Sequence, residues 1–210
     1  MYNSILFYSI PRSGTKVARR YVSSKSNLLD KGEITSFESF KNLSIDPFVA
    51  TIHSYVGISC DDIIEKSNEI NSKLIVLVRP NLFDFIVSTV ASNILKKTLF
   101  LPGEEVTISN MQAVYDSVFS LPTHMRTFKL AAFKLIKAGA CIRFPPVITE
   151  SLDNNTVYEF SANQQIKEFK KQYENQFVLK NVKNYRDWDK FCSLGKHLSE
   201  EDLRNIKHSV

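Results

Sequence analysis

A short stretch near the N-terminus combines a tight turn with residue types that bind anions. Residues 9–16 read Ser-Ile-Pro-Arg-Ser-Gly-Thr-Lys and overlap the end of an apolar run. The pattern turns helical at Thr15, so the first backbone N–H groups of that helix have no partner within it and point into the turn. The helix dipole adds roughly half a positive charge there, which favours an oxyanion with several acceptor oxygens.

Each residue of this turn has its own use in holding an anion. Gly14 lets the backbone approach closely, Arg12 and Lys16 add positive charge, and Ser13 and Thr15 add hydroxyl donors. The alternative is an ordinary strand-to-helix turn with an exposed Arg12. The spacing differs from the Walker A pattern, because Gly-x-x-x-x-Gly-Lys-Ser/Thr is absent.

A histidine stands where a second apolar run ends. Residues 48–52 form this run and His53 follows it directly. In an open α/β sheet, ligands bind beyond the carboxyl ends of the strands, so we expect His53 at the same edge of the sheet as the 9–16 turn. Histidine is the usual general base near neutral pH. The alternative is a strand-end histidine that only makes local hydrogen bonds.

An arginine ends a third apolar run, and a serine follows in the next helix. Arg79 comes directly after residues 74–78, and its planar guanidinium suits bidentate phosphate binding. Ser88 lies nearly opposite the apolar stripe of the helix expected over residues 81–97, so packing does not require it. The alternatives are a surface salt bridge of Arg79 with Asp84 and a solvated helix position for Ser88.

These side chains need a scaffold, and the first hundred residues alternate apolar strands with helices. The third run is so apolar that both its faces are expected to be buried, as in parallel sheets covered by helices. Such alternation predicts an α/β three-layer sandwich with a mostly parallel central sheet. The expected strands are residues 4–10, 48–52 and 74–78, and the expected helices begin at Thr15 and cover residues 61–70 and 81–97.

The second half of the chain gives a less regular pattern. Residues 109–138 are expected to be helical with a break near Leu121, and residues 140–149 to form a strand that the Pro145-Pro146 pair distorts or places at an edge. Further predictions are a loop over residues 101–105 and helices over residues 161–173 and 200–207. We expect one domain over residues 1–210, with its core in residues 4–150 and a helical or irregular portion in residues 151–210.

Composition narrows the class of protein. The chain has 210 residues with 27 Lys and Arg against 22 Asp and Glu, and its basic residues occur at most in adjacent pairs, whereas nucleic-acid binders usually carry a denser stripe. Three widely spaced cysteines, Cys60, Cys141 and Cys192, fit neither a disulfide framework nor a metal site. No signal peptide or membrane-spanning stretch is recognisable. We therefore expect a soluble, cytoplasmic protein without a nucleic-acid or membrane partner.

Taken in order, the three motifs resemble those of sulfotransferases that use 3′-phosphoadenylyl sulfate (PAPS). The family's first motif, Pro-Lys/Arg-Ser/Gly-Gly-Thr after the first strand, is matched by residues 11–15. Its catalytic histidine at a strand end is matched by His53. Its 3′-phosphate motif is a strand ending in Arg with a Ser in the next helix, which is similar to Arg79 and Ser88. The resemblance covers about residues 4–92.

The resemblance implies a P-loop-like fold and sulfuryl transfer without a metal. It implies that Arg12, Ser13, Gly14, Thr15 and Lys16 hold the 5′-phosphosulfate, with Arg12 also stabilising the leaving oxygen. It further implies that His53 is the general base, that Arg79 and Ser88 hold the 3′-phosphate, and that adenosine 3′,5′-bisphosphate is the product. The acceptor is expected to be a small molecule or a glycan.

Some positions depart from the family pattern, and two other functions remain open. Arg79 and Ser88 are nine residues apart where the family usually has eight, and Lys16 stands where a second Thr is common. The family's C-terminal motif is only echoed in residues 180–191. The alternatives are a P-loop-type kinase for a small metabolite, against which the absence of an acidic Mg²⁺ ligand after the third strand counts, and a catalytically inactive nucleotide-binding protein.

Overall fold

The chain divides into two compact units that alternate along the sequence. The computed structural model describes residues 2–11, 14–26, 28–95, 107–120, 124–143 and 164–194. Unit 1 comprises Met1–Val78, His124–Pro146 and Lys190–Val210, and unit 2 comprises Arg79–Thr123 and Val147–Asp189. The sequence shows no linker at these boundaries. Each unit is described by itself below.

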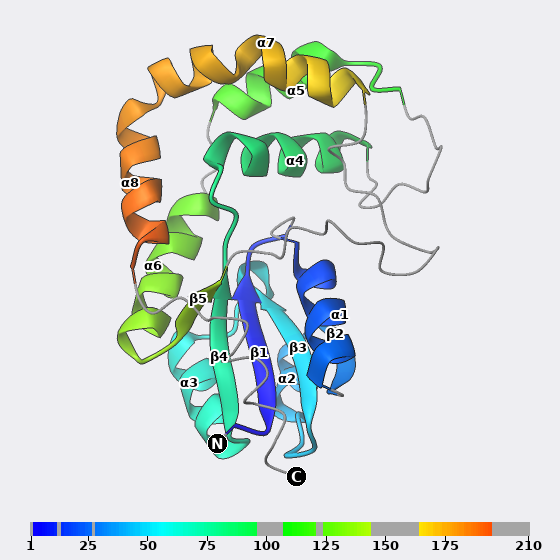
Figure 1. Ribbon diagram of the computed structural model, residues 1–210, viewed down its shortest axis with the longest axis vertical. Helices are drawn as coiled ribbons and strands as arrows, with labels where there is room; N and C mark the ends of the chain where they lie inside the picture. Colours follow the sequence, from blue (N-terminus) through cyan, green and yellow to red (C-terminus); the bar gives the residue numbers. More distant parts are fainter. Residues whose placement is uncertain are drawn as a thin grey trace. The chain divides into compact units, whose positions relative to one another are not determined.

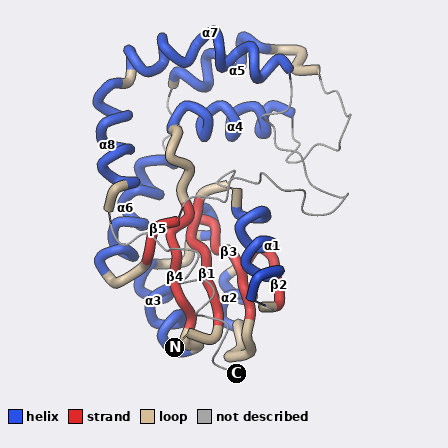
Figure 2. Tube along the Cα trace, in the orientation of Figure 1, coloured by secondary structure: helices blue, strands red, loops and turns tan. Residues whose placement is uncertain are grey.

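Unit 1 is built on a five-stranded sheet in which every neighbouring pair of strands is parallel. The strand order is β2-β3-β1-β4-β5, as Figures 1 and 2 show. The strands are β1 (Ser4–Ser9), β2 (Leu29–Ile34), β3 (Phe48–His53), β4 (Ser72–Leu77) and β5 (Cys141–Arg143). The predicted α/β class with a parallel central sheet is confirmed, and the three apolar runs are β1, β3 and β4.

Helices cover both faces of this sheet. Helix α1 (Thr15–Ser26) packs on β2 and β3, whereas α3 (Cys60–Glu69) and α6 (His124–Lys137) pack on β4. Tyr8 of β1 stacks on Phe128 of α6 with ring centroids 5.8 Å apart. Because side chains alternate along a strand, the residues next to Tyr8 face the opposite side, toward α1.

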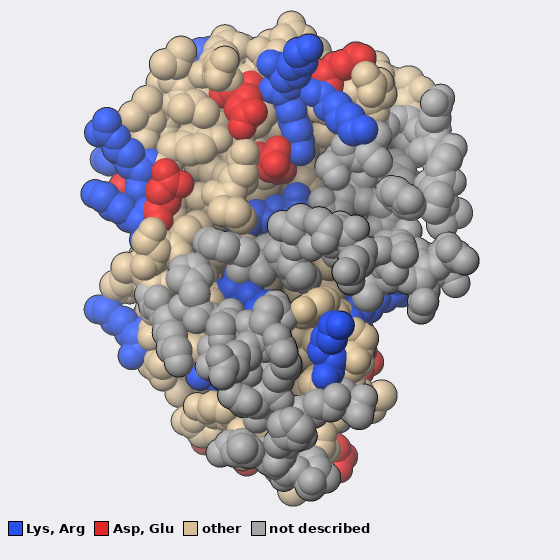
Figure 3. Space-filling view, viewed as in Figure 1, with Lys and Arg blue, Asp and Glu red and all other residues tan. Residues whose placement is uncertain are grey.

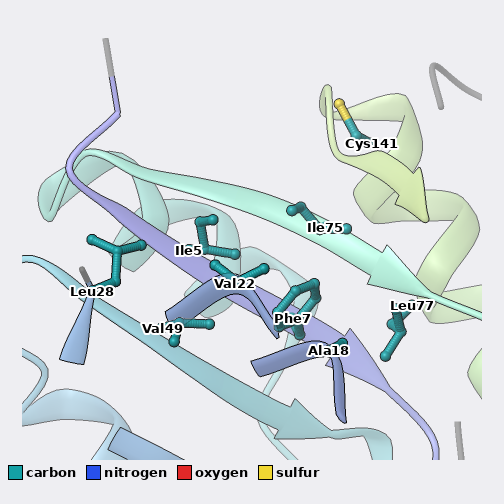
Figure 4. Close-up of a cluster of buried hydrophobic side chains, with 9 residues drawn as sticks. All are labelled: Ile5, Phe7, Ala18, Val22, Leu28, Val49, Ile75, Leu77 and Cys141. Carbon is teal, nitrogen blue, oxygen red and sulfur yellow. The ribbon is translucent and has the colours of Figure 1, made fainter. Parts of the chain in front are cut away.

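The core beneath α1 draws apolar side chains from four strands (Figure 4). Every member of this cluster is buried, and removing apolar surface from water contributes roughly 25 cal/mol per Å² to folding. Its members are Ile5, Phe7, Ala18, Val22, Leu28, Val49, Ile75, Leu77 and Cys141. The cluster holds the first turns of α1 against β1 and β3, and thereby positions the start of α1 at the carboxyl edge of the sheet.

The sequence-based prediction missed β2 and the short helix α2 (Phe37–Lys41). Strand β2 reads Leu-Asp-Lys-Gly-Glu-Ile, and only Ile34 is buried, because the strand lies at an edge of the sheet. Hydrophobic periodicity cannot find a strand with so few apolar residues. The other edge strand, β5, falls within the predicted strand 140–149, of which residues 144–149 lie outside the described part.

A β-bulge interrupts the pairing of β2 with β3. Asp30 pairs with Val49 and Gly32 with Ala50, so Lys31 is the extra residue, and Glu33 then pairs with Thr51. Without the bulge, Asp30 and Glu33 would face opposite sides of the sheet, because their positions differ by three, an odd number. The bulge places both carboxylates on the side of α1. Such re-aiming of side chains is a common use of bulges at sheet edges.

Two further predictions can be compared with the structure. Helix α3 was expected over residues 61–70, which begin with Asp61 and Asp62, and its N-cap is Ser59, whose side chain accepts a hydrogen bond from the Asp62 backbone N–H. Both aspartates lie in the first turn, where negative charge is favourable. In the predicted helical region 109–138 the structure has α5 (Met111–Phe119) and α6, and the break predicted near Leu121 lies outside the described residues.

Unit 2 is helical in its described part. Helix α4 (Leu82–Leu95) packs on α5 and on α7 (Gln164–Lys180), and Figure 1 shows the three running side by side. Helix α8 (Val182–Cys192) follows, and its last residues are assigned to unit 1. Tyr185 of α8 accepts a hydrogen bond from the Phe83 backbone N–H at 3.2 Å, and Trp188 donates to the Arg79 carbonyl at 3.0 Å. The predicted helix 161–173 corresponds to the longer α7, α8 was not predicted, and the predicted elements 101–105 and 200–207 lie outside the described residues.

Candidate functional site

The order of the strands changes direction at β1. From β1 the chain passes through α1 to β2 on one side, and from β3 it passes through α3 to β4 on the other. Ligands of open α/β sheets bind beyond the carboxyl ends of the strands at such a point. The carboxyl end of β1 is therefore the place in unit 1 where the fold favours a ligand.

The turn that leaves β1 has the geometry of a helix start. Gly14 has a φ of 79°, and its carbonyl accepts the first hydrogen bond of α1, from the Ala18 N–H at 2.9 Å. A residue with a Cβ in this left-handed conformation costs about 1–2 kcal/mol, which explains the glycine. Thr15 is buried and Lys16 is half-buried in the first turn. Arg12 and Ser13 lie outside the described residues.

His53 lies beside Ser9, the last residue of β1. The two residues are register partners in the parallel pairing of β3 with β1. His53 is buried, with 3% of its surface exposed. Its Nδ1 lies 3.1 Å from the Ser9 hydroxyl oxygen, and its Nε2 lies 3.3 Å from Oε1 of Glu33. Both ring nitrogens therefore have a partner, and the ring of Tyr55 stacks on the imidazole with centroids 5.4 Å apart.

A buried arginine links β3, the strand of His53, to the edge strand β2. Arg19 of α1 is 5% exposed. Its Nε donates to Asp30 at 2.8 Å, its Nη1 donates to the Thr51 hydroxyl at 3.0 Å, and the same Nη1 lies 3.8 Å from Oε1 of Glu33. Thr51 and His53 face the side of α1 because side chains alternate along β3, and Asp30 and Glu33 face the same side because of the bulge in β2.

Glu33 is the acidic partner of His53. The hydrogen bond from His53 is the main reason why the pKa of Glu33 lies below its ordinary value. Partial burial raises this pKa, whereas the positive charges of His53, Arg19 and Lys16 lower it further. Lys16 of the turn thus lies near enough to Glu33 to act on its charge. The carboxylate is held ionised near neutral pH.

Among the residues around His53 that the sequence did not predict are Ser9, Arg19 and Glu33. Ser9 opened the stretch that was singled out, but it received no role because its partner on a neighbouring strand is 44 residues away. Arg19 read as one of an adjacent pair of basic residues. Glu33 belongs to the strand that carries no periodic signal. Only the bulge, which no pattern of apolar residues marks, brings it to His53.

The other two predicted ligand-binding residues, Arg79 and Ser88, belong to unit 2, whereas Gly14, Lys16 and His53 belong to unit 1. Arg79 follows β4 by two residues and is half-buried. The alternative of a solvated position for Ser88 is wrong, because Ser88 is 3% exposed. Helix α4 is buried from Leu82 to Ala91 apart from the half-buried Asp84, so over these residues no face of the helix is exposed to solvent.

Asp84, which we considered as a partner of Arg79, forms a 2.7 Å ion pair with Lys170. On the face drawn in Figure 3, the described Lys and Arg side chains lie in separate groups, several of them beside Asp or Glu. Surface charge alone therefore does not mark a site on that face.

The described ranges contain neither a cluster of metal-ligating side chains nor a membrane-spanning helix. In the part of the chain that the structure describes, no group of three or more His, Cys, Asp or Glu side chains is placed to hold a metal ion. Among the helices of those same ranges, none has both the length and the apolar character of a membrane span.

Comparison with known proteins adds no relative. Neither protein-family models, nor curated proteins, nor solved structures gave a match to this chain. What indicates function is therefore the geometry at the carboxyl edge of the sheet and the order of the motifs.

Proposed function

We propose that this protein is a sulfotransferase that moves the sulfuryl group of PAPS to an acceptor hydroxyl or amine. One observation carries the proposal: the register pairing of His53 with Ser9, which puts a histidine on the strand next to the glycine turn at the reversal of strand order. A base and an anion-binding turn are the two parts that in-line transfer from a phosphosulfate needs. Their order along the chain is the order in the sulfotransferases that the sequence resembles.

The proposal includes a P-loop-like role for the turn between β1 and α1. The free N–H groups at the start of α1, together with Arg12, Ser13, Thr15 and Lys16, would hold the 5′-phosphate and the sulfuryl group. Gly14 supports this role by its left-handed conformation. Binding of the 3′-phosphate by Arg79 and Ser88 remains a prediction of the sequence.

Sulfuryl transfer from PAPS to the acceptor needs one base and no reactant besides these two. The acceptor oxygen or nitrogen forms a bond to sulfur while the bond from sulfur to the bridging oxygen breaks. The proton of the acceptor goes to His53, and the electron pair of the broken bond stays on the 5′-phosphate of adenosine 3′,5′-bisphosphate. General base catalysis typically contributes about 10²–10⁴-fold, and Arg12 with the turn amides would stabilise the charge on the leaving oxygen.

Ligand binding gives the first test. Thermal unfolding of the full chain is measured with adenosine 3′,5′-bisphosphate and, separately, with ATP and Mg²⁺. A ligand that binds the folded state alone raises the unfolding temperature, and we expect this rise with the bisphosphate and not with ATP. A rise with ATP and Mg²⁺ alone would replace the proposal with a kinase.

The chain offers a matched pair of variants for the turn. Lys16 lies in the first turn of α1, whereas Arg20 is exposed one turn later. Lys16→Ala should weaken bisphosphate binding about 10- to 100-fold, the size of a lost charge-assisted hydrogen bond, while Arg20→Ala should leave it unchanged. Equal effects of the two variants would mean that the turn does not hold the nucleotide.

A further inference from the structure

We infer that Glu33 is a positioning residue that fixes His53 as the tautomer protonated on Nε2, so that Nδ1 is the atom that takes the proton. The tautomer is a property of the folded chain, whereas its use in catalysis rests on the sulfuryl transfer proposed above. Glu33 would then act through His53 rather than on the substrate.

Glu33 lies on the side of the His53 ring that faces β2. An ionised carboxylate can only accept hydrogen bonds. Oε1 of Glu33 lies 3.3 Å from Nε2 of His53, and the nearby charges of Arg19 and Lys16 favour the ionised form of Glu33. A bare Nε2 would place its lone pair against this negative oxygen. Nε2 therefore carries the hydrogen.

Ser9 lies on the side of the His53 ring that faces β1. A neutral imidazole has one N–H, so Nδ1 must be an acceptor once Nε2 is protonated. The Ser9 hydroxyl lies 3.1 Å from Nδ1 and can donate to it. The lone pair of Nδ1 thus points toward the end of β1, which is also the strand that leads into the turn. A base at this atom is directed to the side where the phosphosulfate is expected.

Glu33 is itself held in place by the bulge in β2 and by Arg19. The bulge in β2 turns Glu33 to the side of α1, and Arg19 contacts both Glu33 and Asp30. Arg19 also donates to Thr51, two residues before His53 on β3. The groups that face the His53 ring among the described residues thus come from three directions: Glu33 from β2, Ser9 from β1, and Tyr55 from the turn after β3. In other proteins, partner groups that fix the tautomer of a histidine in this way strongly affect metal binding or catalysis by that histidine.

The test is to observe the two ring nitrogens of His53 directly. Long-range ¹H–¹⁵N correlation spectra of the ¹⁵N-labelled full chain distinguish protonated from bare imidazole nitrogens, and His53→Gln identifies the His53 signals among the four histidines. For the neutral ring we expect a protonated Nε2 and a bare Nδ1. A protonated Nδ1 with a bare Nε2 would overturn the inference, whether or not the protein transfers sulfate.

Three variants show which neighbour sets the tautomer. Glu33→Gln replaces the carboxylate with an amide that can donate or accept, so the single tautomer should give way to a mixture. Ser9→Ala removes the partner of Nδ1, and Asp30→Asn alters the other carboxylate on Arg19 without touching His53. Both should keep the wild-type tautomer. Loss of the tautomer in Ser9→Ala but not in Glu33→Gln would assign the positioning role to Ser9 instead.

Activity gives a separate readout for the same variants. Glu33→Gln should lower kcat for sulfuryl transfer by roughly 10- to 10⁴-fold with little change in bisphosphate affinity, and Glu33→Asp, which keeps the carboxylate, should restore part of it. Asp30→Asn should retain most of the kcat. Wild-type kcat in Glu33→Gln would refute the catalytic part of the inference. If the wild type transfers no sulfate but shows the expected tautomer, the proposed function fails and the assignment of the tautomer stands.

Discussion

His53 is a buried titratable side chain with a partner on each ring nitrogen, which sets what its replacement should do. In His53→Gln the amide can still donate to Glu33, but it cannot take a proton near neutral pH. We expect kcat for sulfuryl transfer to fall by about 10²–10⁴-fold, while binding of adenosine 3′,5′-bisphosphate, measured by calorimetry, stays close to that of the wild type. A variant with near-normal turnover and wild-type binding would mean that another residue is the base.

Glu33 gives a prediction about stability and pH. Its pKa in the folded chain is lowered from the ordinary value of 4.5, first by the hydrogen bond from His53. The unfolded chain therefore binds more protons than the folded chain in the acidic range, and stability rises with pH there. The contribution of Glu33 is fully present above about pH 4.5 and is lost as the pH falls through the lower folded value.

Urea unfolding checks this prediction when the wild type is compared with Glu33→Gln. The wild type should have the larger free energy of unfolding near neutral pH, and the difference should shrink as the pH is lowered below the ordinary pKa of a glutamate. A difference that stays constant or grows on acidification would show that the carboxylate of Glu33 is not stabilised by His53 and Arg19.

At the scale of elements, the bulge in β2 is what brings Glu33 to His53. Gly32 in this bulge has a φ of 77°, and a Cβ added there would meet no atom within 4 Å, so Gly32→Ala is strained in its backbone only. The free energy of unfolding should fall by roughly 1–2 kcal/mol. Because the bulge aims Glu33, the variant should also disturb the single tautomer of His53.

Gly139 provides the matched control for Gly32. It has a φ of 100°, it too has open space around an added Cβ, and it precedes β5 at the opposite edge of the sheet. Gly139→Ala should lower stability, as measured by urea unfolding, by a similar amount but leave the His53 spectrum unchanged. If both variants leave the spectrum unchanged, the bulge does not control the position of Glu33.

The elements also show how far the sequence could predict the structure. Strands β1, β3 and β4 were predicted because both faces of a central parallel strand are buried, which leaves a continuous apolar run. The same physical reason hides β2, an edge strand whose residues are mostly polar. Helix α8 was missed because its residues were compared with a family motif rather than assessed for helical periodicity. The alternative of a solvated position for Ser88 arose because an apolar stripe was expected for a helix that is buried from Leu82 to Ala91 apart from Asp84.

The candidate site was predictable only in the part that strand ends determine. Because the carboxyl ends of parallel strands meet at one edge, the 9–16 turn and His53 could be assigned to the same edge from the chain alone. The partners of His53 could not, since Ser9 depends on the register between β1 and β3, and Glu33 on a single extra residue in β2. The pairing of Ser9 with His53 and the bulge at Lys31 each join segments that are far apart in the chain, so the apolar pattern of a single run marks neither.

At the scale of the whole molecule, the proposal needs a nucleotide with two phosphate groups. Arg79 belongs to unit 2, and its predicted partner is the 3′-phosphate. Arg79→Ala should therefore weaken binding of adenosine 3′,5′-bisphosphate by about 10- to 100-fold and leave binding of adenosine 5′-monophosphate nearly unchanged. Calorimetric titrations with the two nucleotides make the comparison, and equal losses for both would remove Arg79 from this role.

The most direct test of sulfuryl transfer is to follow labelled sulfate from PAPS in a metal-free buffer with a panel of hydroxyl and amine acceptors. We predict that the wild type moves the label to at least one acceptor, forms adenosine 3′,5′-bisphosphate in equal amount, and loses this activity in His53→Gln. Binding of the nucleotide with no transfer above the uncatalysed rate to any acceptor class, or transfer that is unaffected in His53→Gln, would contradict this account.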